Sequence, residues 1–205
     1  MLTLHYHPLS SYCQKALIGL YELGVDFDKN LVDLGDPSAR AAFLALWPIG
    51  KFPLLEERAT GRVIPESSIL LEHVDRGVLL PADGTLEVRL LDRFFDQYIH
   101  APMQRLVADR LRPVDGKDPL GVAAAHAQLQ TAYAYLDARL LATWAAGERF
   151  TLADCAAAPA LFYANECQPF AAFPRLVAYF DRLSVRPSVA RARTEAEPYL
   201  DMFPR

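Results

Sequence analysis

The stretch "LTLHYHPLSSYCQKALIGL" (residues 2–20) changes its hydrophobic period within a few residues, and this change decides the fold of the first part of the chain. Leu2, Leu4 and Tyr6 alternate with polar residues, which is the spacing of a β-strand. From Cys13 onward, apolar residues recur every three or four positions, which is the spacing of an amphipathic helix. The chain is therefore predicted to open with a strand, a short loop and a helix.

Strand-like and helix-like segments continue to alternate up to residue 77. After the first helix the sequence predicts a strand at 25–34, a helix at 37–47, two strands within 52–64 around a turn at Thr60-Gly61, and a helix at 66–77. The order βαβαββα predicts an α/β domain over residues 1–77.

Strand signals disappear after residue 77. Residues 78–86 include "VLLPADGT" (78–85), whose Pro, Gly and Asp predict a linker. The remaining residues, 87–205, are predicted to form an all-α domain. Its helices are expected at 86–112, 120–146, 151–167 and 174–186, with a shorter helix near 188–194.

The composition argues against two kinds of partner. The 205 residues carry 21 Lys+Arg against 25 Asp+Glu, a net charge of -4, without the basic cluster that nucleic-acid binding needs. No apolar run approaches the roughly 18 residues of a membrane span, so no membrane partner is predicted. Three cysteines, an odd number, predict reduced thiols and a cytoplasmic location.

One helix start is defined by its side-chain chemistry. In "FTLADC" (150–155), Thr151 is predicted to be the N-cap, and Asp154 is predicted to reach back to it from the third helical position. The helix that follows is apolar nearly all round, so it is predicted to be buried at the centre of the helical domain. Pro159 is expected to bend it.

The order of elements and three stretches of sequence resemble the cytosolic glutathione transferases. The stretches are "ALWPIGKFPLLEE" (45–57), "RVIPESSILLEHV" (62–74) and "FTLADCAAAPAL" (150–161). The resemblance implies a thioredoxin-like fold for residues 1–77, glutathione as co-substrate and a homodimer. It also implies that the sulfur of glutathione is transferred to an apolar electrophile.

The resemblance further implies which residues bind glutathione. Pro53 is expected to form a cis peptide bond with Phe52, so that the Phe52 backbone pairs with the tripeptide as a short strand would. Glu66 and Ser67, at the start of a helix, are expected to bind the ammonium and carboxylate of the γ-glutamyl end. Lys51 is expected to meet the glycyl carboxylate.

Two serines and a cysteine compete for the role of activating the thiol. Ser11 is followed by Gln14 in a capping-box pattern, so Ser11 is predicted to be the N-cap. This leaves Ser10 with a free hydroxyl at the positive end of the helix, where it is predicted to stabilise the thiolate by donating a hydrogen bond. Tyr6, which can be aligned with the catalytic tyrosine of other classes, and Cys13 remain alternatives.

The acceptor pocket is predicted from position alone. Two of its residues flank Ser10 and three lie on helices of the second domain: Leu9, Tyr12, Tyr98, Met103 and Tyr163. No metal site is predicted, because the His5-x-His7 pair has no third ligand at a recognisable spacing. Two other functions stay open: a glutathione-dependent isomerase of the maleylacetoacetate type, and a transferase-like module that binds or regulates without catalysis.

Overall fold

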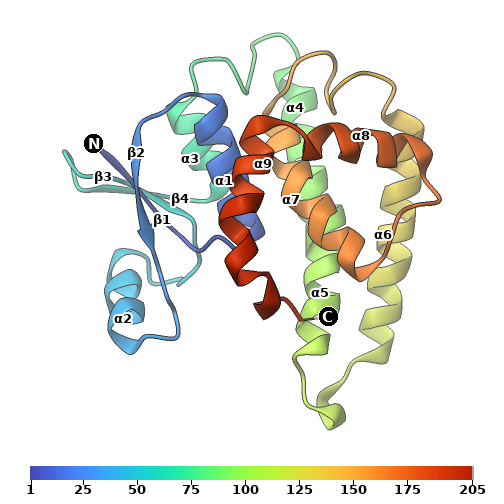
Figure 1. Cartoon of the computed structure of the whole chain (residues 1–205), viewed down its shortest axis with the longest axis horizontal. Helices are drawn as coiled ribbons and strands as arrows, with labels where there is room; N and C mark the ends of the chain where they lie inside the picture. The colour runs from blue at the N-terminus through green and yellow to red at the C-terminus, as the bar shows by residue number, and fades with distance from the viewer. Residues whose placement is uncertain (205) are drawn as a thin grey trace.

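The computed structural model describes residues 1–204, with a four-stranded sheet at one end and a group of packed helices at the other (Figure 1). The strands are β1 (Leu2–Tyr6), β2 (Phe27–Leu31), β3 (Leu54–Glu57) and β4 (Arg62–Pro65). Their order in the sheet is β2-β1-β3-β4; β1 pairs parallel with β2 and antiparallel with β3, which pairs antiparallel with β4. The order of strands and helices predicted for the first part of the chain is confirmed.

Three helices complete the α/β part: α1 (Ser11–Glu22), α2 (Pro37–Leu46) and α3 (Ser67–Val74). Helices α1 and α3 lie between the sheet and the other helices, whereas α2 lies apart from them (Figure 1). Leu4 and Tyr6 of β1 belong to the main core, which also contains the apolar face of α1. Phe43 of α2 packs into a smaller, separate core with Val32 and Leu54.

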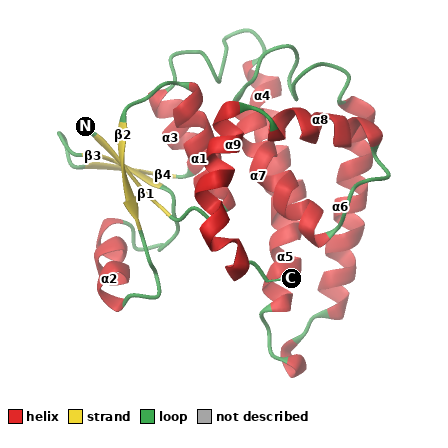
Figure 2. Ribbon diagram, in the orientation of Figure 1, coloured by secondary structure: helices red, strands yellow, loops and turns green. Residues whose placement is uncertain are grey.

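The second part of the chain is helical, and the strands are confined to the opposite end of the molecule (Figure 2). Helix α4 (Thr85–Phe94) leads through a π-helical turn (Phe95–His100) into α5 (Ala101–Arg110). The others are α6 (Pro119–Arg139), α7 (Leu152–Cys167), α8 (Pro174–Ser184) and α9 (Pro187–Ala196), with 3-10 turns at Val114–Gly116 and Glu197–Met202. Over residues 1–204, no helix combines the length and the apolar character needed to cross a membrane.

Helix α7 is buried over most of its length, as predicted. The Thr151 N–H donates to Oδ2 of Asp154 at 2.8 Å, which confirms the predicted capping interaction. Asp154 also accepts hydrogen bonds from the Ala145 N–H at 2.9 Å and from the Tyr179 hydroxyl at 2.6 Å. Its buried carboxylate therefore ties the start of α7 to α8 and to the loop before α7. The helix continues through Pro159.

Two predicted helices have different bounds in the structure. The helix expected at 86–112 is interrupted by the π-helical turn, directly before Pro102. Proline has no N–H to donate within a helix, so Pro102 is better placed in the first turn of a new helix, as it is in α5, than in the middle of a longer one. The helix expected at 120–146 ends at Arg139, and beyond it Trp144 and Gly147 pair their backbones at 2.8 and 3.3 Å. Gly147 has a φ of 130°, a conformation that favours glycine.

Candidate functional site

One end of the sheet brings the predicted glutathione-binding segments together. The antiparallel register pairs Leu54 of β3 with His5 of β1 on one side and with Pro65 of β4 on the other. The loop after β1, the residues before β3 and the residues after β4 therefore leave the sheet at the same end. These three segments carry Ser10, Phe52-Pro53 and Glu66-Ser67.

The Phe52-Pro53 peptide bond is cis, as expected. Pro53 is buried, and the Phe52 ring lies 5.9 Å from the Phe43 ring, between centroids. Phe52 also lines an open cleft of about 360 Å³, whose walls include Leu9 and Ser10. The predicted backbone-pairing residue and the predicted thiol-activating serine thus face the same space.

The backbone at Glu66 is strained. Glu66 is the N-cap of α3 and has a φ of 71°, the one positive φ of a non-glycine residue in the described chain. This conformation costs about 1–3 kcal/mol for a residue with a side chain, and it persists only where the surroundings impose it. Ser67 is buried at the first helical position. The N–H groups of this first turn are suited to bind an anion, as the γ-glutamyl carboxylate requires. Lys51 is exposed next to Phe52.

The N-cap of α1 is Ser10, so the prediction that Ser11 caps this helix is wrong. Oγ of Ser10 accepts a hydrogen bond from the Cys13 N–H at 3.4 Å. That bond uses a lone pair of the hydroxyl and leaves its proton available to a ligand in the cleft. Ser11 is buried instead, and its Oγ is hydrogen-bonded to Nε2 of His100.

The side chain of Gln14 explains why the capping box does not form. Its amide donates to the Pro8 carbonyl and to the Tyr163 hydroxyl, both at 2.9 Å. The Tyr163 hydroxyl in turn donates to the Leu9 carbonyl at 2.7 Å. Gln14 and Tyr163 thus fix the loop that carries Ser10, and Gln14 is not free to reach back to Ser11.

The two alternative activating residues are buried in the main core. Cys13 has no exposed surface, and burial raises the pKa of its thiol to about 12. A thiol with such a pKa is protonated at pH 7, and the protonated form is not the nucleophile. Burial also raises the pKa of the Tyr6 hydroxyl.

A neutral histidine lies behind the N-terminus of α1. His100 is buried, and its ring centroid lies 4.3 Å from that of Tyr12. Burial, assisted by the charge of Lys15, lowers the pKa of His100 to about 4. The imidazole is therefore uncharged at pH 7.

The five residues predicted for the acceptor pocket lie in different surroundings. Leu9 lines the cleft next to the N-terminus of α1. Tyr12 is half-buried, whereas Tyr98 is exposed on the π-helical turn. Met103 is buried in the main core, and the Tyr163 hydroxyl is bonded within the fold. A contact of any of the five with substrate stays a prediction.

Sequence reasoning missed most of the cleft wall. The missed residues come from the loop after β1, from the loop before α2 and from the C-terminal 3-10 turn: His7, Val32, Asp33, Leu34, Gly35 and Met202. His7 stands three positions before Ser10, and this proximity could have drawn attention to it. The other two segments approach Ser10 only in the folded chain.

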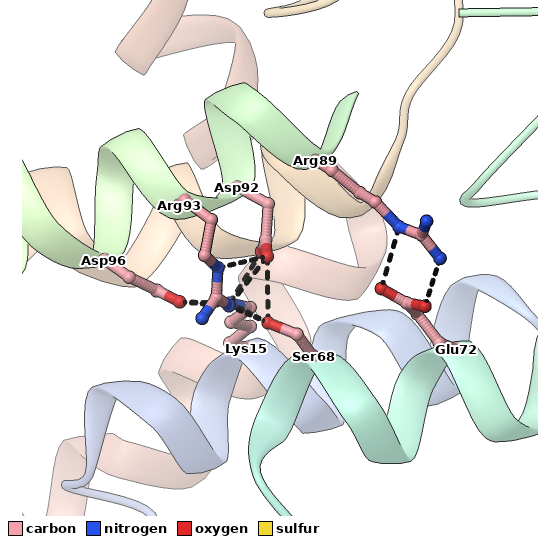
Figure 3. Close-up of polar contacts among 7 residues, drawn as sticks. All are labelled: Lys15, Ser68, Glu72, Arg89, Asp92, Arg93 and Asp96. Carbon is pink, nitrogen blue, oxygen red and sulfur yellow. Dashed lines mark hydrogen bonds and ion pairs between the residues drawn. The ribbon is translucent and has the colours of Figure 1, made fainter. Parts of the chain in front are cut away.

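Sequence reasoning also missed a buried charge cluster between α1, α3 and α4 (Figure 3). The Lys15 side chain is 1% exposed, and its Nζ lies 2.7 Å from Oδ1 of Asp92 and 2.9 Å from Oδ2 of Asp96. It also donates to Oγ of Ser68 at 2.9 Å, and Ser68 donates to Asp92 at 2.9 Å. Arg93 completes what we call the Lys15 cluster, contacting both carboxylates at 2.8 Å.

The Lys15 cluster joins the two segments that carry the site. Lys15 lies on α1, four positions after Ser11, and Ser68 directly follows Ser67 at the start of α3. Two positive and two negative side chains give the cluster no net charge. The pKa of Asp96 is nonetheless raised, because burial outweighs the opposing attraction of Lys15. The spacing of the two aspartates, one helical turn apart, was the sequence signal for a partner cation.

The described residues include no group of three or more His, Cys, Asp or Glu side chains arranged to hold a metal ion. His5, one of the two histidines considered for such a site, is instead bonded to Glu56 at 2.9 Å and to Asn30 at 2.8 Å. All three cysteines are free.

Comparison with known proteins links both halves of the chain to one family. Residues 4–77 match the family model of the glutathione S-transferase N-terminal domain, and residues 94–187 match that of the C-terminal domain. A glutathione S-transferase structure from Methylobacterium radiotolerans, in complex with glutathione sulfonate, is 28% identical, with 93% of each chain covered and a TM-score of 0.80. A glutathione transferase from Methylococcus capsulatus is 26% identical over 96% of this chain and 100% of that chain, with a TM-score of 0.79.

The fold is also similar to that of a structure with lower sequence identity. A glutathione S-transferase from Methylobacillus flagellatus, solved with glutathione bound, is 23% identical. The two structures align over 94% of this chain and 98% of that chain, with a TM-score of 0.85.

Proposed function

Because the chain belongs to the cytosolic glutathione transferase superfamily, we propose that it activates glutathione with Ser10 and transfers the sulfur to an apolar electrophile. The observation that carries the proposal is the position of Ser10. It caps α1, its Oγ accepts a hydrogen bond from the Cys13 N–H, and it shares a cleft with Phe52. The buried thiol of Cys13, with its raised pKa, and the buried hydroxyl of Tyr6 support Ser10 over the alternatives.

The chemistry required of Ser10 is modest. A free thiol has a pKa of about 8.5, so only a few per cent is thiolate at pH 7. Each unit of pKa depression needs about 1.4 kcal/mol of preferential stabilisation of the anion. The Ser10 O–H and the N-terminus of α1 together can supply roughly one to two units. The Cys13 N–H that donates to Ser10 Oγ polarises this hydroxyl further, which strengthens it as a donor.

The other site residues are assigned to the parts of glutathione that they would bind. The Phe52 backbone pairs with the cysteinyl unit, and Pro53 sets the direction of that backbone. Glu66 and Ser67 bind the γ-glutamyl end at the start of α3, while Lys51 meets the glycyl carboxylate. Residues 1–77 then form the glutathione-binding domain and 78–86 the linker, and the helical residues 87–205 contribute to the acceptor pocket.

The assembly proposed for this protein is a homodimer through α3 and α4. Apolar side chains stand exposed on these two helices: Ile69 is 53%, Leu86 is 83% and Leu90 is 50% exposed. Near them, Arg89 and Glu72 form a two-point ion pair that joins the two helices (Figure 3). A second copy would cover these side chains. The three free cysteines support a cytoplasmic location.

Titration of the bound glutathione thiolate by ultraviolet difference absorbance tests the role of Ser10. Ser10→Ala should raise the pKa of the bound thiol by roughly one to two units, because the donor to the anion is lost. Cys13→Ala is the matched control and should leave this pKa close to that of the wild type. Loss of turnover in a folded Cys13→Ala protein would contradict the assignment, and failure of the wild type to bind glutathione would point to a non-catalytic module.

A further inference from the structure

A second cavity lies between the sheet and α2, with a volume of about 260 Å³. Four residues of α2 line it at the spacing of one helix face: Ala39, Ala42, Phe43 and Leu46. Phe43 is the one residue of this helix that is buried. The two alanine side chains are short, so the space beside Phe43 stays open.

Helix α2 is held to the sheet mainly through Phe43. It lies apart from the other helices (Figure 1), and most of its residues are exposed. Segments that bury few apolar side chains separate from the rest of a protein at a low cost in free energy. A molecule that filled the cavity would add apolar contacts to α2 and fix its position against the sheet.

A chain of hydrogen bonds supplies the polar part of the cavity wall. His5 lines the cavity and is 7% exposed, with its Nε2 2.9 Å from Oε2 of Glu56 and its Nδ1 2.8 Å from Nδ2 of Asn30. Because a carboxylate accepts, the proton of the neutral imidazole lies on Nε2, and Asn30 donates to Nδ1. This orients the Asn30 amide. Its Oδ1 has no hydrogen-bond partner among residues 1–204, so it can accept from a ligand.

The other lining side chains are apolar, so the cavity suits a neutral, largely apolar molecule with one donor for Asn30. A dry apolar cavity of about 150 Å³ binds benzene, so about 260 Å³ admits a molecule of one or two fused rings. Leu31, also on the wall, is 47% exposed, which leaves the cavity open to solvent on that side.

The cavity shares a wall with the cleft that contains Ser10. Val32 lines both spaces, and its N–H donates to the Tyr6 carbonyl at 2.9 Å. The Phe43 ring contacts the Phe52 ring, with 5.9 Å between centroids, and Phe52 is the residue proposed to pair with glutathione. A molecule that fixes α2 therefore also fixes two residues of the cleft wall.

We propose that the cavity beneath α2 binds a compact, neutral, apolar effector with one hydrogen-bond donor, and that the bound effector raises the affinity for glutathione. The effector is not consumed in the reaction, because its cavity is separate from the one that contains Ser10. The coupling rests on the proposed function, whereas the binding of the effector does not.

Both ligands favour the same arrangement of α2, which gives the coupling its sign. Glutathione paired with the Phe52 backbone holds that ring against Phe43, and the effector holds Phe43 from the side of the cavity. Each ligand therefore lowers the cost of ordering α2 for the other. The coupling is reciprocal, so glutathione must raise the affinity for the effector by the same factor.

One substitution on α2 closes the cavity, and another provides its matched control. Ala42→Leu places a larger side chain in the cavity, and leucine favours helices nearly as well as alanine. Ala41→Leu adds the same side chain to the face of α2 that points away from the cavity, where Ala41 is exposed. Indole is the probe, because it has two fused rings and one N–H donor. Indene has the same shape without that donor.

Isothermal titration calorimetry tests the site. Indole should bind the wild type and Ala41→Leu equally, should not bind Ala42→Leu measurably, and should bind about fivefold more tightly than indene. No binding to the wild type, or equal binding to Ala42→Leu as expected of indole in the acceptor pocket, would overturn the site. Equal affinities for indole and indene would overturn the role of Asn30.

The same method tests the coupling. Saturating indole should lower the Kd for glutathione about fivefold or more in the wild type and in Ala41→Leu, and should not change it in Ala42→Leu. A Kd that indole leaves unchanged in the wild type would overturn the coupling alone. A protein that binds indole beneath α2 but never glutathione would refute the proposed function and the coupling together, while supporting the site.

Discussion

Replacing Lys15 by methionine should destabilise the protein by about 3–5 kcal/mol, because it leaves two buried carboxylates short of a partner. The side chains of Asp92 and Asp96 are 3% and 10% exposed, so water cannot replace the lost ammonium. Ser68 would lose its donor from Lys15 as well. Methionine has a similar length and fills most of the space, which confines the change to charge and hydrogen bonding.

Arg93 limits the loss without preventing it. Its side chain is 50% exposed and contacts both carboxylates, so one positive charge remains for two negative ones. An exposed cation is screened by water and compensates less than a buried one. The pKa of Asp96, already raised by burial, should rise further because the attraction of Lys15 disappears.

Urea unfolding followed by tryptophan fluorescence measures this loss in both halves of the molecule. Trp47 lies at the end of α2 and Trp144 in the loop before α7, and these are the two tryptophans of the sequence. Variants in which one of the two tryptophans is replaced by phenylalanine give the fluorescence change of each half separately. Because the Lys15 cluster lies between α1, α3 and α4, both signals should shift to lower urea in Lys15→Met.

The matched control is Lys29→Met. Lys29 pairs with Glu195 at 2.6 Å, but the two side chains are 29% and 22% exposed, so its removal should cost about 1 kcal/mol or less. In the double variant Lys15→Met/Asp92→Asn the loss should be smaller than the sum of the single losses by at least about 1 kcal/mol. Additive losses, or a Lys15→Met protein no less stable than Lys29→Met, would refute the reasoning.

Three further predictions concern His100, glutathione binding and assembly. Lowering the pH from 7 to 4 should reduce the free energy of unfolding by up to about 3 kcal/mol through His100. Folding lowers the pKa of this histidine from 6.5 to about 4, so the unfolded state takes up the proton first as the pH falls. His100→Gln should flatten this part of the curve of urea midpoint against pH, and an unaltered curve would contradict it. Ser67→Ala should raise KM for glutathione about tenfold with little change in kcat, because it removes binding common to ground and transition states; a fall in kcat alone would argue against that role. Leu90→Glu should convert the dimer to a monomer in light scattering, whereas Val114→Glu, at a position 90% exposed on a 3-10 turn, should not; a monomeric wild type would exclude this interface.

Features that depend on neighbouring residues could be predicted from the sequence. The alternation of Leu2, Leu4 and Tyr6 predicted β1, and the pair Thr151 and Asp154 predicted the start of α7, because the partners lie within a few positions of each other. The cis bond at Pro53 came from family resemblance, since composition and spacing do not distinguish it from an ordinary trans bond.

Features that depend on distant partners could not be predicted. The choice between Ser10 and Ser11 as the N-cap turns on Gln14, whose amide is taken by a hydroxyl 149 positions away. The partner of Lys15 at Asp96 lies 81 positions away, so the spacing of Asp92 and Asp96 could indicate a cation but not which one. The cleft around His7 joins three loops, and periodicity carries no information about how loops meet.

The bonds of Tyr163 have a consequence for how the two halves can be exchanged between relatives. One phenol oxygen from α7 bonds the Leu9 carbonyl and the Gln14 amide, so the helical half holds the turn on which Ser10 lies. We expect a chimera that pairs residues 1–77 with a helical half lacking that phenol to keep the proposed γ-glutamyl contacts of Glu66 and Ser67, which do not depend on Tyr163. Without the Tyr163 hydroxyl, the loop that carries Ser10 should be more mobile, and the catalytic rate should fall for that reason.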